Sequence, residues 1–532
     1  MLLRPVGSVV SQSVLVLALA SSARAQAVAP APPENPTTAT KALLGKALFW
    51  DEQLSATKTM ACGTCHRFEQ GGSDPRLGTH PGFDGVFGTS DDVLGSPGVV
   101  AADAAGVYQS VAPFPFVPQV SKRRAQAVID AAFSPSLFWD GRADATFEDP
   151  LTGAVAATAA AALESQAAQP PLNPGEMAHF GTTWNDVADR IAQAKPLALA
   201  TDLPPALAAF VGGRTYPALF RDVYGTPEVT PTRIVFAIAA YERTLISTDT
   251  PFDRYLAGED GALTELESEG LAVFDGAGKC FLCHSGPQLT NHGFFNIGVR
   301  PAFEDPGRFL VTGVASDLGR FKSPTMRNVA LRAPYFHDGS AGDLAEVVEF
   351  YDRGGDFHDN QSELIEPLGL EPAQKTALVQ FLTSATLDPK IALGATPFDR
   401  PTLYTETDRV PAIVAAGSAG SGGIVPRLVA LEPPFVGNPS CALAIADGLA
   451  GAPAFLFASA GGDPATPPFA WISIGTMAGT GQAGFVSFTA SIPRDPTLAG
   501  SILRLRGAIV DPGSASGFAL TPIVEFRFFD AP

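Results

Sequence analysis

The chain has 532 residues, which is long enough for two or three domains with sizeable cores. Its formal net charge of −19 argues against nucleic acid or an anionic membrane surface as a partner, and it suits a basic protein partner instead. No stretch reaches the roughly 18 uninterrupted apolar residues that a membrane-spanning helix needs.

The N-terminus has the pattern of a secretory signal peptide over residues 1–25. Arg4 gives a basic start, residues 14–20 are apolar, and Ala23-Arg24-Ala25 offers small residues for cleavage. We therefore predict export to the periplasm, with cleavage near Ala25. Residues 26–40 are rich in Ala, Pro and Thr and are predicted to be a linker.

Helical periodicity begins at Lys41, where apolar residues between 43 and 48 form a stripe that leads to a cysteine motif. Residues 68–120 are rich in Gly, Asp and Pro and lack periodicity, so they are predicted to be mostly loop. Further helical segments are predicted at Ser121–Phe133, Ala154–Ala168 (an Ala-rich helix or an insertion), Asn185–Ala194, Thr230–Ile246 and Leu263–Phe274.

After about residue 395 the composition shifts to Gly, Pro, Ser and Ala, with short apolar runs between turn residues. This pattern of short apolar runs between turn residues predicts antiparallel β-structure. We expect a small β-sandwich that forms an accessory domain over residues 405–532. The runs are Phe455-Leu456-Phe457, Ala470-Trp471-Ile472, Phe485-Val486-Ser487-Phe488 and Leu503-Arg504-Leu505.

Two Cys-x-x-Cys-His motifs carry the chemistry: Cys62-Gly63-Thr64-Cys65-His66 and Cys280-Phe281-Leu282-Cys283-His284. In each, two thiols can attach one haem covalently and the adjacent His can ligate its iron. A zinc ribbon would pair such units about 15–20 residues apart, which these are not, and disulfides would not need a His after both pairs. We predict two covalently bound haem c groups. The fifth cysteine, Cys441, is expected to be a buried small apolar residue.

Six further blocks surround the motifs in a fixed order. They read Leu44-Gly45-Lys46-Ala47-Leu48-Phe49-Trp50-Asp51, Phe138-Trp139-Asp140-Gly141-Arg142-Ala143, Asn173-Pro174-Gly175-Glu176-Met177, Phe295-Asn296-Ile297-Gly298, Lys322-Ser323-Pro324-Thr325-Met326-Arg327-Asn328-Val329 and Ala333-Pro334-Tyr335-Phe336-His337-Asp338-Gly339. With the two motifs, these blocks resemble the bacterial di-haem cytochrome c peroxidase and MauG superfamily over roughly residues 41–390.

The resemblance implies a mainly α fold of two cytochrome-c-like haem domains, followed here by the small all-β C-terminal domain. The expected boundaries are 41–228 for the N-terminal peroxidatic haem domain and 229–395 for the C-terminal electron-transfer haem domain. The implied reaction is reduction of H2O2 at the N-terminal haem, with a c-type cytochrome or a cupredoxin as electron donor. Two other interpretations stay open: MauG-like oxidation of a protein or organic substrate, and a non-enzymatic di-haem electron-transfer cytochrome.

Two site residues take their expected roles from this resemblance. Trp139 matches the family tryptophan that lies between the haems, where it would relay electrons. Glu176 matches the family glutamate in the Asn-Pro-x-Glu-Met block. A carboxylate above the iron can move a proton from the proximal to the distal oxygen of peroxide, first as general base and then as acid.

The expected ligand of the second haem departs from the peroxidase pattern. Typical peroxidases of this family carry a distal methionine on a helix after the His-Asp-Gly block, and the matching position here is Tyr351, as in MauG-like members. A phenolate is a hard anionic ligand that favours Fe(III) and higher states, whereas a thioether favours Fe(II). Met326 is a rival ligand, but core packing is the preferred interpretation for it.

The distal side of the first haem and the calcium site of relatives also depart from the pattern. The family spacing for a distal His reaches residues 113–116, which contain none; His80 is the alternative, with solvent exposure preferred. Arg124 stands where relatives hold calcium with an asparagine, so calcium is in doubt. Asp84–Asp92 could gather carboxylates around calcium but lacks the full EF-hand pattern, and a solvated acidic turn is preferred. His337 is expected near a haem carboxylate, and His292 and His358 to be structural or exposed.

Overall fold

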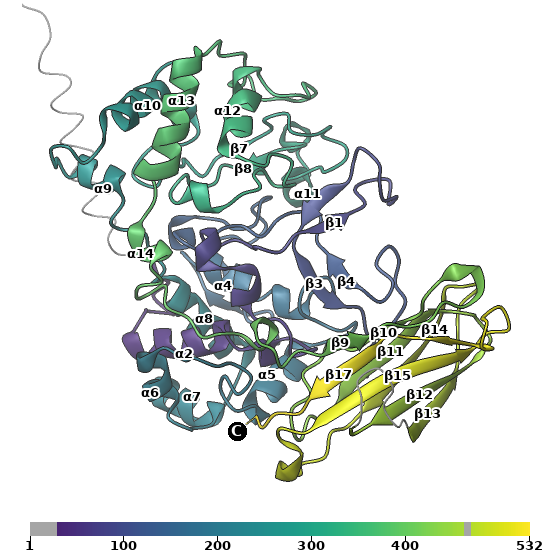
Figure 1. Cartoon of the computed structure of the whole chain (residues 1–532). Coiled ribbons are helices and arrows are strands. Elements are labelled where there is room, and N and C mark those ends of the chain that lie inside the picture. The colour runs from purple at the N-terminus through teal and green to yellow at the C-terminus, as the bar shows by residue number, and fades with distance from the viewer. Residues whose placement is uncertain (1–28, 462–469, 532) are drawn as a thin grey trace, which may run out of the picture.

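The computed structural model describes residues 29–461 and 470–531, so the predicted signal peptide lies outside the described residues. The chain forms a helical body of two lobes with a β-domain against one side of it (Figure 1). Among the residues described, no helix is both long enough and apolar enough to cross a membrane.

The N-terminal lobe is built on helices α2 (Ala39–Phe49) and α8 (Pro231–Glu242), which cross closely. A side chain at Gly45 would stand 1.8 Å from the carbonyl oxygen of Ala237, so only glycine permits this crossing. The lobe is completed by α4 (Ala162–Ala167), α5 (Trp184–Gln193), α6 (Pro205–Val211) and α7 (Tyr216–Tyr224). Helices α2, α5 and α8 therefore confirm the helices expected from Lys41, at 185–194 and at 230–246.

Two sequence-based boundaries need correction at this lobe. Helix α8 lies beyond residue 228, where the second haem domain was expected to begin, yet it packs against α2 because its apolar side chains complete the N-terminal core. The described part of the expected linker is also packed: Asn35 is fully buried and donates hydrogen bonds to Glu164 (2.7 Å) and to the carbonyl oxygen of Phe236 (2.9 Å).

The C-terminal lobe is built on α10 (Glu265–Asp275) packed against α13 (Pro372–Gln380), with α9 (Pro251–Leu256) and α12 (Leu344–Asp352) around them. The helix expected at 263–274 is confirmed. Its N-terminus is fixed by a capping box in which Thr264 accepts from the backbone N–H of Glu267 and Glu267 accepts from that of Thr264.

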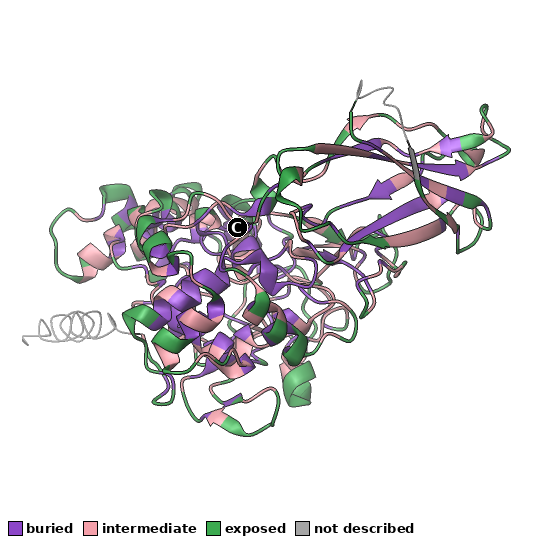
Figure 2. Ribbon diagram, turned by 90° about the horizontal axis from the view of Figure 1, so that it is seen from below, coloured by how far each residue is buried: buried purple, intermediate pink, exposed green. Residues whose placement is uncertain are grey.

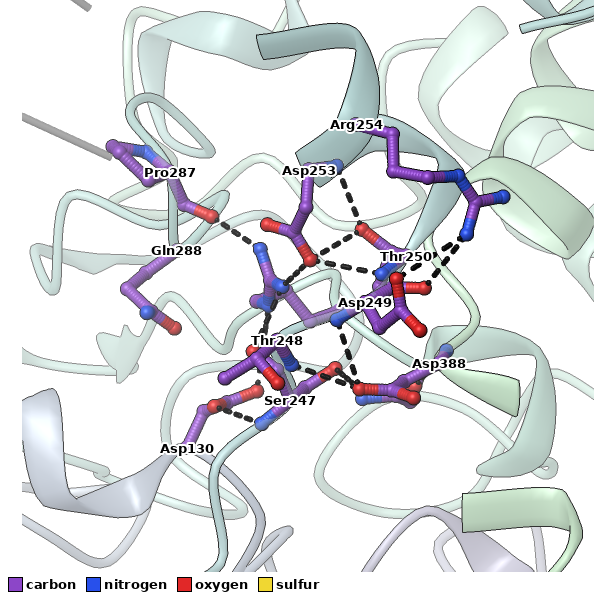
Figure 3. Close-up of polar contacts among 12 residues, drawn as sticks. Asp130, Ser247, Thr248, Asp249, Thr250, Asp253, Arg254, Pro287, Gln288 and Asp388 are labelled. Carbon is purple, nitrogen blue, oxygen red and sulfur yellow. Dashed lines mark hydrogen bonds and ion pairs between the residues drawn. The ribbon is translucent and has the colours of Figure 1, made fainter. Parts of the chain in front are cut away.

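A buried polar network joins the lobes where α8 leads into α9 (Figure 3). Arg327 forms ion pairs with Asp130 and Asp253 and donates to the carbonyl oxygen of Ser247 (2.9 Å). The N–H of Ser247 donates to Asp130 (2.9 Å), and Asp388 accepts from the next two backbone N–H groups (2.8 and 3.1 Å). Four separate segments of the chain thus satisfy one another's buried charges and backbone hydrogen-bonding groups.

The segment expected to be helical at 121–133 is not a helix; only a 3-10 turn forms, at Ala131–Phe133. The rest runs between the lobes, and its backbone N–H groups form hydrogen bonds to both. The N–H of Arg124 donates to the carbonyl oxygen of His337 (2.8 Å), and the N–H of Val128 donates to that of Gly72 (3.0 Å). Tertiary partners have overridden the local periodicity.

The loop expected at 68–120 is confirmed, with two small hairpins in it: β1 (Gly78–His80) with β2 (Val93–Gly95), and β3 (Pro97–Val100) with β4 (Pro118–Val120). In the Ala-rich segment, β6 (Val155–Ala157) pairs with β5 (Phe147–Glu148) before α4 begins.

The C-terminal residues form the expected sandwich of two antiparallel sheets. One sheet has the order β10 (Arg427–Val429), β11 (Cys441–Gly448), β14 (Gly484–Ala490). The other has the order β13 (Ala470–Thr476), β12 (Pro453–Ser459), β15 (Ile502–Val510), β17 (Ile523–Arg527), β9 (Ala412–Ala415), with β16 (Phe518–Leu520) beside β15. Buried residues run along these strands and through the helical body (Figure 2).

Strand β11 is buried on both faces. Leu443 and Ile445 point into the sandwich, and the intervening Ala442, Ala444 and Ala446 pack on the helical body. Small side chains let the body approach this sheet closely. Cys441, at the start of the strand, is 1 % exposed, as predicted for a packing residue.

Candidate haem and peroxide site

The first motif lies at the wall of a cavity in the N-terminal lobe. Cys62, Cys65 and His66 line it, and the short helix α3 (Cys62–Cys65) presents them. The Nδ1 atom of His66 lies 3.1 Å from the carbonyl oxygen of Gly72, an arrangement that leaves Nε2 for a metal. Burial lowers the pKa of His66, which favours the neutral imidazole that a metal ligand requires.

The second motif lies at the wall of a second cavity, in the C-terminal lobe. Cys280, Cys283 and His284 line it. The Nδ1 atom of His284 lies 3.1 Å from the carbonyl oxygen of Pro324 and 3.2 Å from that of Leu289, and burial lowers the pKa of this His to about 4. None of the cysteines forms a disulfide among the described residues. Two thiols and one oriented neutral imidazole per cavity fit a covalently attached haem at each motif.

Trp139 lines both cavities. Its Nε1 donates to the carbonyl oxygen of Arg124 (2.8 Å), and its own carbonyl oxygen accepts from the N–H of Lys322 (2.8 Å). The turn after it needs Gly141, which has φ +74° and where a side chain would stand 2.4 Å from the ring of Phe294. The indole is therefore held between the two cavities, at the place predicted for a relay between the haems.

Glu176 lines the first cavity together with His66 and Trp139. Asn173 donates to its Oε1 (2.6 Å). Burial raises the pKa of Glu176, opposed by the positive charge of Arg142 and by the Asn173 hydrogen bond. A carboxyl whose proton affinity is raised by its surroundings is suited to general acid and base work.

Tyr351, on α12, lines the second cavity, and its hydroxyl makes no hydrogen bond to any described residue. Burial raises its pKa well above the ordinary value, and the thiols of Cys283 and Cys280 add to the effect. Met326 lines the same cavity but belongs to the segment that holds His284: its N–H donates to the carbonyl oxygen of Leu289 (3.2 Å). It also packs on the lobe's core, as predicted.

The histidines outside the motifs are distributed as follows. His80 lines neither cavity; it is half-buried rather than solvent-exposed, because its ring packs on Phe114 (5.7 Å between centroids). His337 is buried, lines the second cavity and stacks on Phe321 (3.8 Å). His292 is half-buried and His358 is exposed.

The acidic turn is held by its own hydrogen bonds. Asp91 accepts from the N–H groups of Phe83 (2.5 Å) and Asp84 (2.8 Å) and from the hydroxyl of Thr89 (2.6 Å). Across the described residues, no group of three or more His, Cys, Asp or Glu is placed to hold a metal ion.

Sequence reasoning missed three buried cations at the second cavity: Arg124, Lys322 and Arg332. Arg124 was considered only for calcium, and Lys322 only as part of a family block. Only Arg332 offered a clue, because its neighbours Ala330, Leu331 and Ala333 are apolar. The burial of all three side chains is a tertiary property.

Comparison with known proteins agrees with this site. A model of the di-haem cytochrome c peroxidase family matches residues 39–261. The chain is 31% identical over 318 residues to cytochrome c551 peroxidase of Nitrosomonas europaea, covering 59% of this chain and 73% of that one. It is 29% identical over 360 residues to the methylamine utilization protein MauG of Methylorubrum extorquens, covering 67% and 81%. The crystal structure of a MauG-like protein associated with microbial copper homeostasis matches with a TM-score of 0.50 at 24% identity, over 70% of this chain and 95% of that chain, which supports the fold.

Fold, site and relatives thus define an oxidoreductase of the peroxidase class with haem c as cofactor. The chain belongs to the di-haem cytochrome c peroxidase family, which includes MauG.

Proposed function

We propose that H2O2 is reduced in the first cavity and that the second cavity supplies or shares the electrons through Trp139. The observation that carries this assignment is the lining of the cavities: Glu176, His66 and Trp139 share the first, and Trp139 also lines the second. A haem held by Cys62, Cys65 and His66 would supply the iron to which peroxide binds and from which it takes electrons.

Glu176 has the protonic role in this proposal. Reduction of H2O2 to two waters takes two electrons and two protons. The Glu176 carboxylate takes the proton of the oxygen nearer the iron and returns it to the farther oxygen as the O–O bond breaks, so that water leaves. Asn173 holds one carboxylate oxygen, which fixes the direction of the other.

The second haem is proposed to be held by Cys280, Cys283 and His284, with Tyr351 as the sixth ligand of its iron. Two observations support this ligation. The Tyr351 hydroxyl lines that cavity and makes no hydrogen bond to any described residue, and the rival Met326 belongs to the segment that holds His284. A phenolate would lower the potential of this haem, as in MauG-like members, and make it a poor high-potential electron store.

The acidic chain, of net charge −19, supports a small basic c-type cytochrome or cupredoxin as electron donor in the periplasm. Oxidation of a protein or organic substrate is the second candidate. Leu310, which is 65% exposed, and Pro306 line the first cavity, so its wall reaches an apolar surface.

The test compares Glu176→Gln with the matched control Glu148→Gln, whose exposed side chain lines neither cavity. We expect Glu176→Gln to keep two haems per chain and to lose about 10²–10⁴-fold in peroxide turnover, with the control unaffected. A Glu176→Gln protein as fast as the parent refutes the assigned role. If both haems are low-spin and their spectra do not change on addition of peroxide, before or after partial reduction, the protein is instead an electron-transfer cytochrome.

A further inference from the structure

Three buried cations surround the second cavity without a carboxylate partner. Arg124, Lys322 and Arg332 are 5%, 7% and 9% exposed, and none forms an ion pair with any residue in the described ranges. Other buried arginines are paired: Arg243 with Glu164 and Arg327 with Asp130. Burial lowers the pKa of Lys322 to about 7, so it can lose its charge near neutral pH. A buried charge is costly unless it is compensated, so the two unpaired arginines require an explanation.

Arg124 is the member of this set that reaches both haem sites, because it alone of the three lines both cavities. Its guanidinium donates to the carbonyl oxygens of Arg332 (2.8 Å), Asp74 (3.2 Å) and Ala333 (3.4 Å). Asp74 follows the first haem motif, and residues 332–333 belong to the C-terminal lobe. One side chain therefore ties together main chain from the surroundings of both haems.

The main chain of Arg124 is fixed as firmly as its side chain. Its N–H donates to the carbonyl oxygen of His337 (2.8 Å), and its carbonyl oxygen accepts from the indole N–H of Trp139 (2.8 Å). The stem of the side chain packs on Gly339, where a Cβ would stand 3.2 Å from Arg124 Cδ and 2.8 Å from Leu94 Cβ. The orientation of Trp139 is thus coupled to the placement of Arg124.

The Nε atom of Arg124 is buried without a hydrogen-bond partner among the described residues. Burial lowers the pKa of Arg124, but guanidinium starts from a value near 12.5, so the group stays charged at neutral pH. Neutral carbonyl dipoles supply part of the compensation. The haem carboxylates are the anions that the two cavities would bring to it.

We propose that Arg124 is a positioning residue shared by both haem sites: a fixed positive charge between the cavities that raises the reduction potentials of both haems and holds Trp139 in place. This inference rests on the proposed function, because it requires one haem in each cavity. A nearby positive charge favours the reduced form of an iron centre, which carries one positive charge fewer.

The test uses the purified full-length holoprotein and measures the midpoint potentials of both haems by spectroelectrochemistry. Arg124→Gln removes the charge beside both cavities, and Arg332→Gln removes it beside the second cavity only. Arg254→Gln is the control, because Arg254 is on α9, is 37% exposed at its side chain and lines neither cavity. We expect a downward shift of both potentials in Arg124→Gln, of the second alone in Arg332→Gln and of neither in the control.

Arg124→Lys provides the second arm, since it keeps the charge but loses the planar fork that reaches three carbonyl groups. Both potentials should stay near the parental values in this variant even if Arg124→Gln does not fold. A fall in both potentials of the Lys variant, or unmoved potentials in a folded Gln variant, overturns the inference. The haem content of the parent protein distinguishes failure of this inference from failure of the proposed function. A parent protein without two haems per chain refutes the proposed function.

Discussion

For the proposed reaction with peroxide, the most important side chains are those whose proton affinity is changed by their surroundings. Glu176 combines a burial that raises its pKa with a hydrogen bond from Asn173 that opposes the rise. The block around Glu176 made the residue a candidate from sequence, since the resemblance is local. Its environment could not be predicted, because it depends on Arg142 and on a cavity wall from distant segments.

The raised pKa of Glu176 predicts an acid limb in the peroxide reaction. The carboxylate acts first as a base, so the rate should fall as pH drops through a pKa that lies above the ordinary range. Asn173→Ala removes a donor that stabilises the anion, and the limb should move to still higher pH. Rapid-mixing rates across pH measure this, and a limb that stays in place in Asn173→Ala contradicts the account.

Tyr351→Phe tests the proposed ligand of the second haem. Removing the hydroxyl should alter the absorption and EPR signals of that haem alone, because Tyr351 lines only the second cavity. Tyr351→Met should raise the potential of the same haem, since a thioether favours Fe(II). An unchanged spectrum in Tyr351→Phe rules out ligation.

Elements with strong local patterns were predicted correctly, and elements defined by distant partners were not. Helices α5, α8 and α10 have apolar periodicity and capping residues such as Thr264, which act locally. Residues 121–133 have a similar spacing of apolar residues, but their backbone N–H groups donate to carbonyl oxygens of both lobes. Nor does the sequence of α8 reveal which lobe it completes.

The β-domain is attached through an apolar contact that also reaches the site. Phe116 is 4% exposed and its ring lies 4.9 Å from that of Phe485 on β14. Strand β3, beside this contact, abuts the main chain at Glu176: a side chain at Gly98 would stand 2.0 Å from the carbonyl oxygen of Gly175. The domain thus supports the wall of the first cavity.

Phe116→Ala should weaken this attachment. We expect a loss of about 3 kcal/mol in unfolding free energy, the lower end for a buried Phe, and faster proteolysis between the body and the β-domain. Thermal unfolding and limited proteolysis measure both. Phe518→Ala is the control, because Phe518 is 42% exposed on β16; equal effects in the two variants would contradict a specific contact.

At the scale of the whole molecule, stability should depend on the buried carboxyl group of Glu52, which lies where the chain passes from the helical body into the β-domain. Glu52 is 1% exposed and accepts from the N–H of Tyr404 (2.6 Å) and the hydroxyl of Thr405 (2.7 Å). Burial raises its pKa from 4.5 to about 7, despite the lowering effect of these hydrogen bonds.

Folded Glu52 therefore binds its proton more tightly than the unfolded chain does. Its stabilising contribution is complete below about pH 4.5 and is lost as pH rises through about 7, a change of up to about 3 kcal/mol. Denaturant unfolding should show lower stability at pH 8 than at pH 5.5, with a smaller difference in Glu52→Gln. The same difference in the parent and in this variant would contradict the assignment, and Glu148→Gln should resemble the parent.

The most direct test of two unequal haem sites is a titration of the resting oxidised protein with H2O2, followed by absorption and EPR spectra. If the sites are unequal as proposed, the parent responds at stoichiometric peroxide and the Glu176→Gln protein, with the same two haems, does not. Two haems that remain unchanged by peroxide in the parent, both before and after partial reduction, would contradict it.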